Sequence, residues 1–190
     1  YKSRRGHITD NRIYRAKMGG YFLEGCTEVI GRGNTMLENG SRGTTIERGS
    51  VNCLFSDNVV SGSGREGLWA PDCVGLVVTG NVFSRNGRKP NGKEPHQIWN
   101  ANITINEARH DPSESPTRDY LISDNIIVTT ASQVAAIRVD TTASTQAIVI
   151  RDNLLRGERT DIAVSGANPA GVVVAENVEN ETAAPVPAEP

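Results

Sequence analysis

Leu54-Phe55-Ser56-Asp57-Asn58-Val59-Val60 is the stretch that decides the fold, because copies of its pattern recur along the whole chain. Each copy has an alternating apolar run, a polar or small residue, an asparagine and a second apolar run. The asparagines are Asn11, Asn34, Asn58, Asn81, Asn125, Asn153 and Asn177, and they are separated by 23, 24, 23, 44, 28 and 24 residues. A repeat of this length is typical of a solenoid, in which each unit buries its apolar face only against its neighbours.

The local pattern predicts strands. Apolar residues alternate on both sides of each asparagine, and no stretch shows a sustained helical period with caps. We therefore predict an all-β, right-handed parallel β-helix of about eight coils, since parallel crossovers are almost always right-handed. An asparagine repeated at one corner would form a ladder of amides that satisfies buried backbone groups. The seven asparagines are accordingly assigned to architecture rather than to a site.

The 44-residue step is interpreted as two periods. It predicts a loop-bearing inserted coil near 85–119, whose strand at 97–106 has lost the asparagine. Residues 85–96 and 107–119 are expected to be loops, because they are rich in Pro, Gly and Asn. Functional residues concentrate in loops on a rigid scaffold, so we expect these loops to wall a groove. The alternative is that they are solvated excursions or an oligomer contact.

A second apolar strand precedes each asparagine strand. Together they read Gly-(apolar)-x-(apolar), a turn of five to nine residues, and (apolar)-x-x-Asn-x-(apolar). This pattern resembles the right-handed parallel β-helix repeat of the pectin-lyase-like superfamily over residues 6–180. The resemblance implies a carbohydrate-active protein, a polysaccharide lyase or glycoside hydrolase acting on a glycan laid along the exposed sheet face. It also implies a secreted or extracytoplasmic location, in the periplasm or at the cell surface.

The same superfamily includes proteins without catalytic activity, so fold alone leaves the activity open. The alternative is a non-catalytic glycan-binding or structural segment of a larger secreted, surface or tailspike-like protein, with a homo-trimer as one such assembly. The polysaccharide or oligosaccharide partner is common to the glycan-binding interpretations.

Composition bounds the organisation of the 190 residues. We expect one β-helix over 1–180, followed by a Pro/Ala-rich tail or linker at 181–190. A net charge of −2 argues against a nucleic-acid partner, and no apolar run is long enough for a membrane span. Because the chain opens directly ahead of a complete strand, we expect earlier N-terminal coils in the parent chain.

Cys26, Cys53 and Cys73 do not match the familiar zinc spacings. We expect them to be buried small residues or free thiols, because the two that share a column lie two coils apart, too far for a disulfide. The sequence indicates no metal site and no cofactor.

Alternation on the second strand predicts an aromatic platform. If Leu68 and its counterparts point inward, Trp69, Trp99 and Arg138 point outward on successive coils, in the same column as Phe22. Such indole rings could pack against sugar rings. A register slip of one residue would instead bury both tryptophans.

The candidate site residues cluster around this platform. We predict that Glu66, His96 and Asp72 are catalytic, because the column alignment places Glu66 one coil from His96. The alternative is that Glu66 and His96 form a surface ion pair. The predicted substrate-binding residues are Trp69, Trp99, Arg65, Arg138 and Glu47, although either Thr45 or Glu47 could occupy the platform column. Both a hydrolase with two carboxylates and a lyase with a cation and a base remain open.

Overall fold

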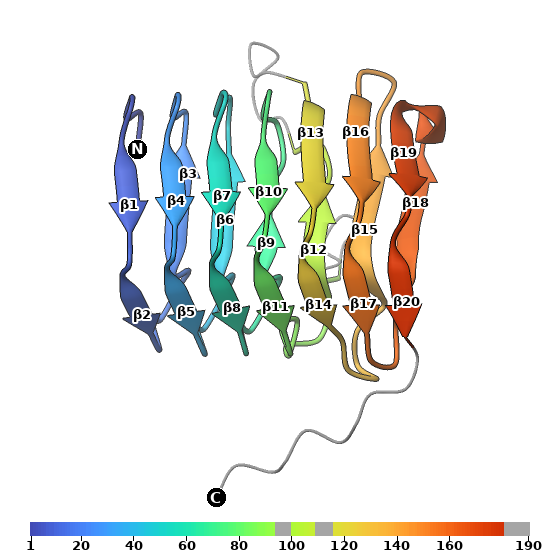
Figure 1. Ribbon diagram of the computed structural model, residues 1–190, viewed down its shortest axis with the longest axis horizontal. Coiled ribbons are helices and arrows are strands. Elements are labelled where there is room, and N and C mark those ends of the chain that lie inside the picture. The colour runs from blue at the N-terminus through green and yellow to red at the C-terminus, as the bar shows by residue number, and fades with distance from the viewer. Residues whose placement is uncertain (94–99, 109–115, 181–190) are drawn as a thin grey trace, which may run out of the picture.

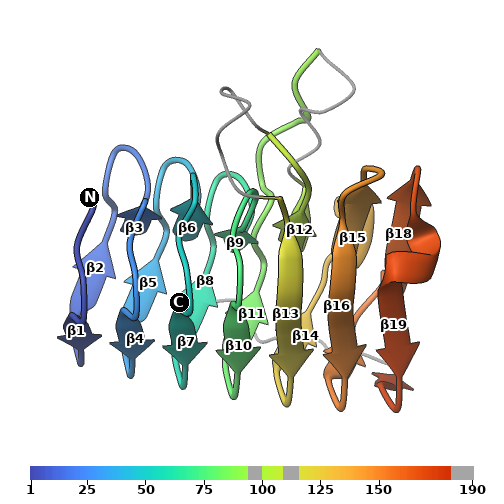
Figure 2. The same ribbon diagram turned by 90° about the horizontal axis from the view of Figure 1, so that it is seen from above.

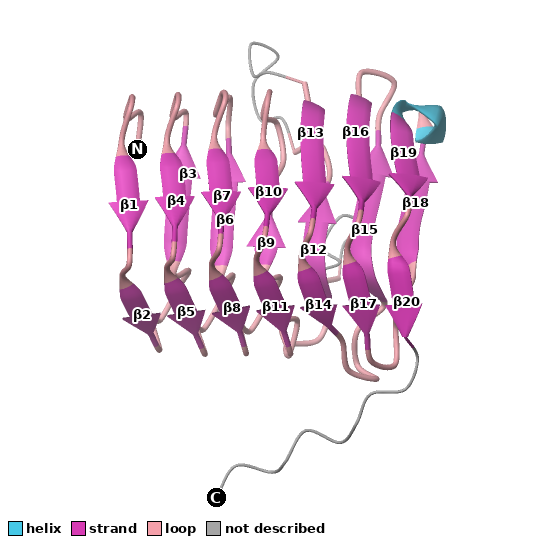
Figure 3. Ribbon diagram, in the orientation of Figure 1, coloured by secondary structure: helices cyan, strands magenta, loops and turns pink. Residues whose placement is uncertain are grey.

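The computed structural model describes residues 1–93, 100–108 and 116–180. Their strands wind into a parallel β-solenoid, which Figure 1 shows from one side and Figure 2 from above. Within these ranges the only helical element is the 3-10 helix η1 (Pro169–Gly171), coloured cyan in Figure 3. The expected all-β parallel solenoid is confirmed.

Three sheets run along the solenoid, and every strand pairs in parallel with its counterpart one coil away. Sheet A contains β1 (His7–Thr9), β4 (Ile30–Arg32), β7 (Leu54–Ser56), β10 (Val77–Thr79), β13 (Arg118–Ser123), β16 (Gln146–Arg151) and β19 (Val172–Ala175). Sheet B contains β2 (Arg12–Tyr14), β5 (Thr35–Leu37), β8 (Val59–Ser61), β11 (Val82–Ser84), β14 (Ile126–Val128), β17 (Leu154–Arg156) and β20 (Val178–Asn180). Sheet C contains β3 (Tyr21–Glu24), β6 (Thr44–Glu47), β9 (Leu68–Trp69), β12 (Ala101–Ile105), β15 (Ala135–Thr141) and β18 (Ile162–Gly166).

The core lies inside the coil, where the middle residue of each short strand points inward. Phe55 and Val78 are fully buried and stack in one column of sheet A, while Phe83 is fully buried in sheet B. The ring centroids of Tyr21 and Phe55 lie 5.6 Å apart, and those of Phe55 and Phe83 lie 6.4 Å apart. Each coil thus buries its apolar residues against like residues of the next coil.

The asparagine ladder occupies the corner between sheets A and B. The Oδ1 atom of Asn58 accepts hydrogen bonds from the backbone N (2.8 Å) and Nδ2 (3.0 Å) of Asn34. Its Nδ2 donates to the Oδ1 of Asn81 and to the carbonyl of Gly31, both at 3.0 Å. The amides therefore replace water for backbone groups buried inside the corner, and their architectural role is confirmed.

The residue before each ladder asparagine turns the chain through the left-handed region. Asp57 has φ 55° and Gly33 has φ 68°. Aspartate and glycine adopt this conformation at lower cost than most residues, which explains why they recur at this position.

The glycines before the sheet C strands are required by close packing rather than by a left-handed turn. Gly43 and Gly67 do not have left-handed φ values. A Cβ on Gly43 would collide with Val60, and one on Gly67 would lie 2.6 Å from the Nδ2 of Asn86. These glycines therefore allow the backbone to pass close to the core of sheet B.

The interpretation of the 44-residue step as two periods is wrong. Asn81 donates directly to the Oδ1 of Asn125, from its backbone N at 3.0 Å and from its Nδ2 at 2.9 Å. β10 likewise pairs directly with β13. The step is thus one coil with long excursions on both sides of β12, and the described residues form seven coils where the sequence predicts about eight. Loop-closure entropy rises slowly with length, so the period can stretch at little cost.

Cys26, Cys53 and Cys73 are buried free thiols, as expected. In the described part of the chain, no helix is sufficiently long and apolar to cross a membrane. The proposed tail at 181–190 lies outside the described residues.

We predict that Asn58→Ala lowers the free energy of unfolding by about 3 kcal/mol, because it leaves the buried N–H of Asn34 and the carbonyl of Gly31 without partners. Asn11→Ala is the matched control: Asn11 is exposed at the first coil, and its loss should cost less than about 1 kcal/mol. Urea denaturation followed by circular dichroism measures both. Equal losses of unfolding free energy in the two variants would contradict the proposal that the buried amides of the ladder stabilise the fold.

Candidate functional site

The outward face of sheet C carries the predicted platform column. Backbone pairing aligns Phe22, Thr45, Trp69, Thr104 and Arg138 on successive coils. The predicted placement of Phe22, Trp69 and Arg138 in one column is confirmed, and Thr45 is the residue that occupies it in β6. Glu47 is instead paired with Glu24 in the next outward column.

The column position predicted for Trp99 is occupied by Thr104 instead. Thr104 is the sheet neighbour of Trp69, since β12 begins at Ala101. Trp99 and His96 lie outside the described residues.

The register of β12 also removes the predicted alignment of Glu66 with His96. Leu68 pairs with Ile103, so the residue level with Glu66 is Ala101 rather than His96. The alignment failed because Ile98-Trp99 resembles Leu68-Trp69 in sequence. The apolar alternation of Ile103 and Ile105 was the better sequence signal, and the structure shows that this segment is the true strand.

Trp69 is partly buried rather than a bare platform. The guanidinium carbon of Arg42 lies 3.8 Å from the centroid of its ring. Its indole Nε1 donates a 2.8 Å hydrogen bond to the Oδ1 of Asn106, just after β12. The indole thus supports a cation and is tied to the neighbouring coil.

Glu66 lies beneath the same arginine. Its Oε2 is 3.1 Å from the Nε of Arg42, and its side chain is 3% exposed against 21% for Arg42. Burial raises the pKa of Glu66, and the charge of Arg42 opposes that shift. A raised carboxyl pKa is common at functional sites. In this arrangement, however, the group that meets the solvent is the guanidinium.

A second arginine, Arg48, repeats this layering at the other end of β6. Arg48 Nη1 lies 2.8 Å from Glu24 Oε1, and its Nε lies 3.9 Å from Glu47 Oε1. The Arg48 side chain is 42% exposed, whereas those of Glu24 and Glu47 are 16% and 9% exposed. On this part of the face the carboxylates lie inside and the guanidiniums lie outside.

Asp72 anchors the excursion that follows β12. Both of its carboxylate oxygens accept from the backbone N of Ala108, at 3.0 and 3.1 Å. Its own backbone N donates to the Oγ1 of Thr117 at 2.9 Å, and that hydroxyl donates to the carbonyl of Asn106. Asp72 is fully buried and holds both described ends of the excursion. Its catalytic role stays a prediction.

The two other predicted binding residues lie at the edges of this surface. Arg138 forms an ion pair with Asp140 two residues further along β15. Arg65 lies at the corner before β9, where its carbonyl accepts from the backbone N of Gly87 at 2.7 Å. The structure therefore brings Glu66, Trp69 and Glu47 together with Arg42, Arg48 and Asn106.

Arg42 and Asn106 belong to the site but were not predicted from the sequence. A signal for Arg42 was present: it precedes Gly43 as Glu66 precedes Gly67, 24 residues later, so the two opposite charges occupy equivalent positions on adjacent coils. Asn106 had no such signal, because its position depends on the true end of β12.

No three His, Cys, Asp or Glu side chains converge on a point suited to a metal ion in residues 1–93, 100–108 and 116–180. The chemistry available on the described face is therefore that of arginine, carboxylate, amide and indole groups.

Comparison with known proteins agrees with this architecture. Residues 1–92 match the family model described as the right handed beta helix region. Residues 1–92 thus resemble a right-handed β-helix family, and the same parallel solenoid continues to β20. Its solenoid of three parallel sheets is consistent with the pectin-lyase-like superfamily.

Among solved structures, the crystal structure of an alginate lyase from Paenibacillus sp. str. FPU-7 is similar to this β-helix. The similarity covers 91% of this chain and 71% of that chain, at 13% sequence identity and a TM-score of 0.42. At this level it carries no argument about activity. No curated protein matches the sequence.

We predict a pH signature for the buried carboxyl. Because burial raises the pKa of Glu66, its contribution to stability is fully present below the ordinary value of 4.5 and is lost as the pH rises through the raised pKa. The parent should therefore lose stability relative to Glu66→Gln as the pH rises above 4.5, as measured by urea denaturation.

Glu38→Gln provides a control of opposite sign. The hydrogen bond from Arg15 lowers the pKa of Glu38. The contribution of Glu38 to stability is therefore present above the ordinary pKa and is lost as the pH falls. If the stability of the parent and that of Glu66→Gln changed with pH in the same way, the burial of an ionisable group at this position would be contradicted.

Proposed function

We propose that this β-helix is part of a carbohydrate-active protein and that its sheet C face, around β6, β9 and β12, holds an acidic glycan. The observation that carries the proposal is the layering of charge, with Arg42 above Glu66 and Arg48 above Glu24 and Glu47. Guanidinium groups bind carboxylates with two parallel hydrogen bonds, so an outward layer of arginines suits a uronate-containing chain.

The position of the long excursions supports the same face. Both leave the ends of β12, and Figure 2 shows their described parts extending beyond the neighbouring coils. The second is anchored where it leaves β12, because the carboxylate of Asp72 accepts from the backbone N of Ala108. Loops on a rigid scaffold are where binding and catalytic groups concentrate.

Within this proposal, the described arginines suit a lyase reaction better than hydrolysis. A glycoside hydrolase needs two carboxyl groups about 5–9.5 Å apart facing the scissile bond. Glu66 and Glu47 instead lie beneath arginines. A lyase needs a cation to neutralise the uronate carboxylate and a base to remove the C5 proton. Arg42 and Arg48 would supply the cations, and we retain His96 as the proposed base.

In this mechanism Glu66 acts as a positioning residue. Its carboxylate holds the Nε of Arg42 at 3.1 Å, while the ring of Trp69 packs against the guanidinium. Arg42 is thereby kept in one orientation before substrate arrives, which reduces the entropy lost on binding. A polysaccharide substrate accords with the proposed secreted or extracytoplasmic location.

The second candidate function is non-catalytic glycan binding by a segment of a larger protein. The specific observation in its favour is that the buried carboxylates of Glu66 and Asp72 are already engaged, by Arg42 and by the N–H of Ala108. Under this alternative the same face binds the acidic glycan without turnover.

We predict that the Arg42→Ala, Arg48→Ala double variant weakens binding of a polyuronate at least about tenfold, because it removes two charge-assisted contacts. Isothermal titration calorimetry with polyuronates and with neutral polysaccharides measures the effect. Arg32→Ala is the matched control, since Arg32 is an exposed arginine in an ion pair with Asp57 on sheet A. Equal affinity for neutral and acidic chains, or an unchanged double variant, would refute the acidic-glycan proposal.

Turnover separates the two candidate functions. For a lyase, we predict new absorbance from unsaturated products on a polyuronate, and a loss of at least about a hundredfold in kcat for His96→Ala. New reducing ends without unsaturation would indicate a hydrolase. Binding without either product would favour the non-catalytic function.

A further inference from the structure

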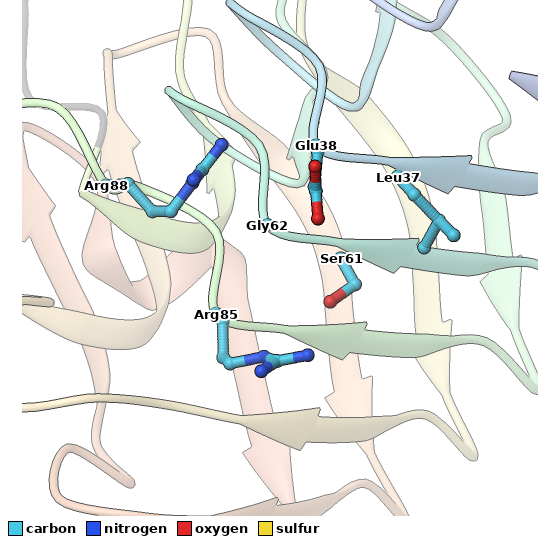
Figure 4. Close-up of a pocket in the computed structure, with 6 residues that line it drawn as sticks. All are labelled: Leu37, Glu38, Ser61, Gly62, Arg85 and Arg88. Carbon is cyan, nitrogen blue, oxygen red and sulfur yellow. The ribbon is translucent and has the colours of Figure 1, made fainter. Parts of the chain in front are cut away.

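A small hollow lies at the corner where sheet B turns toward sheet C, away from the face described above. Figure 4 shows its lining, which comes from three successive coils. The lining residues are Leu37, Glu38, Ser61, Gly62, Arg85 and Arg88. Its volume is about 180 Å³, below the range of about 300–1,000 Å³ typical of sites that enclose a whole small-molecule ligand. The hollow therefore suits a single chemical group.

The hollow exists because one corner residue has no side chain. Arg15, Glu38, Gly62 and Arg85 follow the ends of successive sheet B strands, and all four have positive φ, between 52° and 67°. They form a column with a spacing of about 4.8 Å per coil. Gly62 leaves a gap between the side chains of Glu38 and Arg85.

Corner arginines elsewhere have a carboxylate partner on the next coil. Arg5 pairs with Glu28 at 2.9 Å, and Arg15 pairs with Glu38 at 2.8 Å. Arg85 departs from this pattern: its neighbour on one side is Gly62, and the chain on the other side reaches Thr129. In the described part of the chain, no carboxylate lies within ion-pair distance of Arg85.

A second guanidinium is brought to the same gap. The loop that carries Arg88 is pinned to the preceding coil, where the backbone N of Gly87 donates to the carbonyl of Arg65 and that of Lys89 donates to Gly64, both at 2.7 Å. Arg88 thus joins Arg85 at the hollow, as Figure 4 shows.

The remaining polar groups complete a cationic setting. Glu38 is held by Arg15, whose hydrogen bond is the main reason for its lowered pKa. The hydroxyl of Ser61 accepts from that of Ser84 at 2.8 Å, which leaves its own proton for a ligand oxygen. With Glu38 balanced by Arg15, the charges of Arg85 and Arg88 give the hollow an excess of two positive charges.

We propose that this hollow is an oxyanion-binding subsite that takes the carboxylate or sulfate group of an acidic sugar. The bound group would occupy the place that a carboxylate side chain at position 62 would fill, between Arg85 and Arg88, with Ser61 donating a hydrogen bond. The proposal does not rest on the glycan site of sheet C, because the two sites share no residue.

Binding of inorganic sulfate, galacturonate and neutral galactose, followed by NMR titration at low ionic strength, tests the subsite. We expect the two anions to shift resonances of residues 61–62 and 85–88, and galactose to leave them unchanged. The Arg85→Ala, Arg88→Ala double variant should weaken anion binding at least about tenfold. Arg156→Ala, which removes an exposed sheet B arginine outside the hollow, should bind like the parent.

Gly62→Glu provides a sharper variant, because it supplies the missing carboxylate from the chain itself. Glu38 already occupies the same corner with φ 53°, close to the 67° of Gly62. A Cβ at position 62 would make only an ordinary contact of 3.5 Å with Glu38 Cγ. We expect Gly62→Glu to fold and to abolish anion binding. If it does not fold, the double arginine variant decides.

Anion binding that persists in the double variant, or shifts with galactose equal to those with the anions, would overturn the proposal. Preference for sulfate or for galacturonate identifies which group the subsite takes. The Arg42→Ala, Arg48→Ala variant must retain this binding, so that failure at sheet C and failure here are distinguishable.

Discussion

The hydrogen-bonded ladder of asparagine amides at the corner between sheets A and B is the interaction on which the rest of the solenoid depends. Only two residues separate the strands at this corner, as Asp57 and Asn58 do between β7 and β8, and Asn58 is fully buried. Asn58 and its counterparts satisfy the backbone groups of the corner and connect each coil to the next. Because the amides bond only when the coils are in register, the ladder aligns the side chains of all three sheets into columns.

The same constraint explains why variation concentrates elsewhere. Between Asn81 and Asn125 the ladder continues without interruption, although the intervening chain is almost twice the usual length. The extra residues enter at the two corners that flank β12, which carry no part of this ladder. A coil can therefore acquire long excursions beside sheet C while its core pairing is unchanged, and that separation places the candidate site on the sheet C face.

The sequence predicted the features that depend on local alternation of apolar residues. It did not predict the strand register that depends on loop length. The ladder, the inward column through Phe55 and the outward position of Trp69 all follow from period-two patterns within a few residues. The register of β12 does not, because a loop of any length can precede it and Ile98-Trp99 imitates the expected strand. The contact of Arg42 with Trp69 was equally hidden, since a long side chain on one coil can reach several positions on the next.

The pairing of arginines on the outer columns depends on which residue occupies the equivalent position of the next coil. An arginine on one coil lies about 4.8 Å from the equivalent position on the next, so a carboxylate there is captured as an ion pair. Where the carboxylate is the more buried partner, as with Glu66, the face presents guanidinium to the solvent. Where the equivalent position is glycine, as at Gly62, the arginine lacks that partner and a gap remains. Exposed pairs contribute little to stability, so either arrangement can arise without endangering the fold and can be used to bind anions.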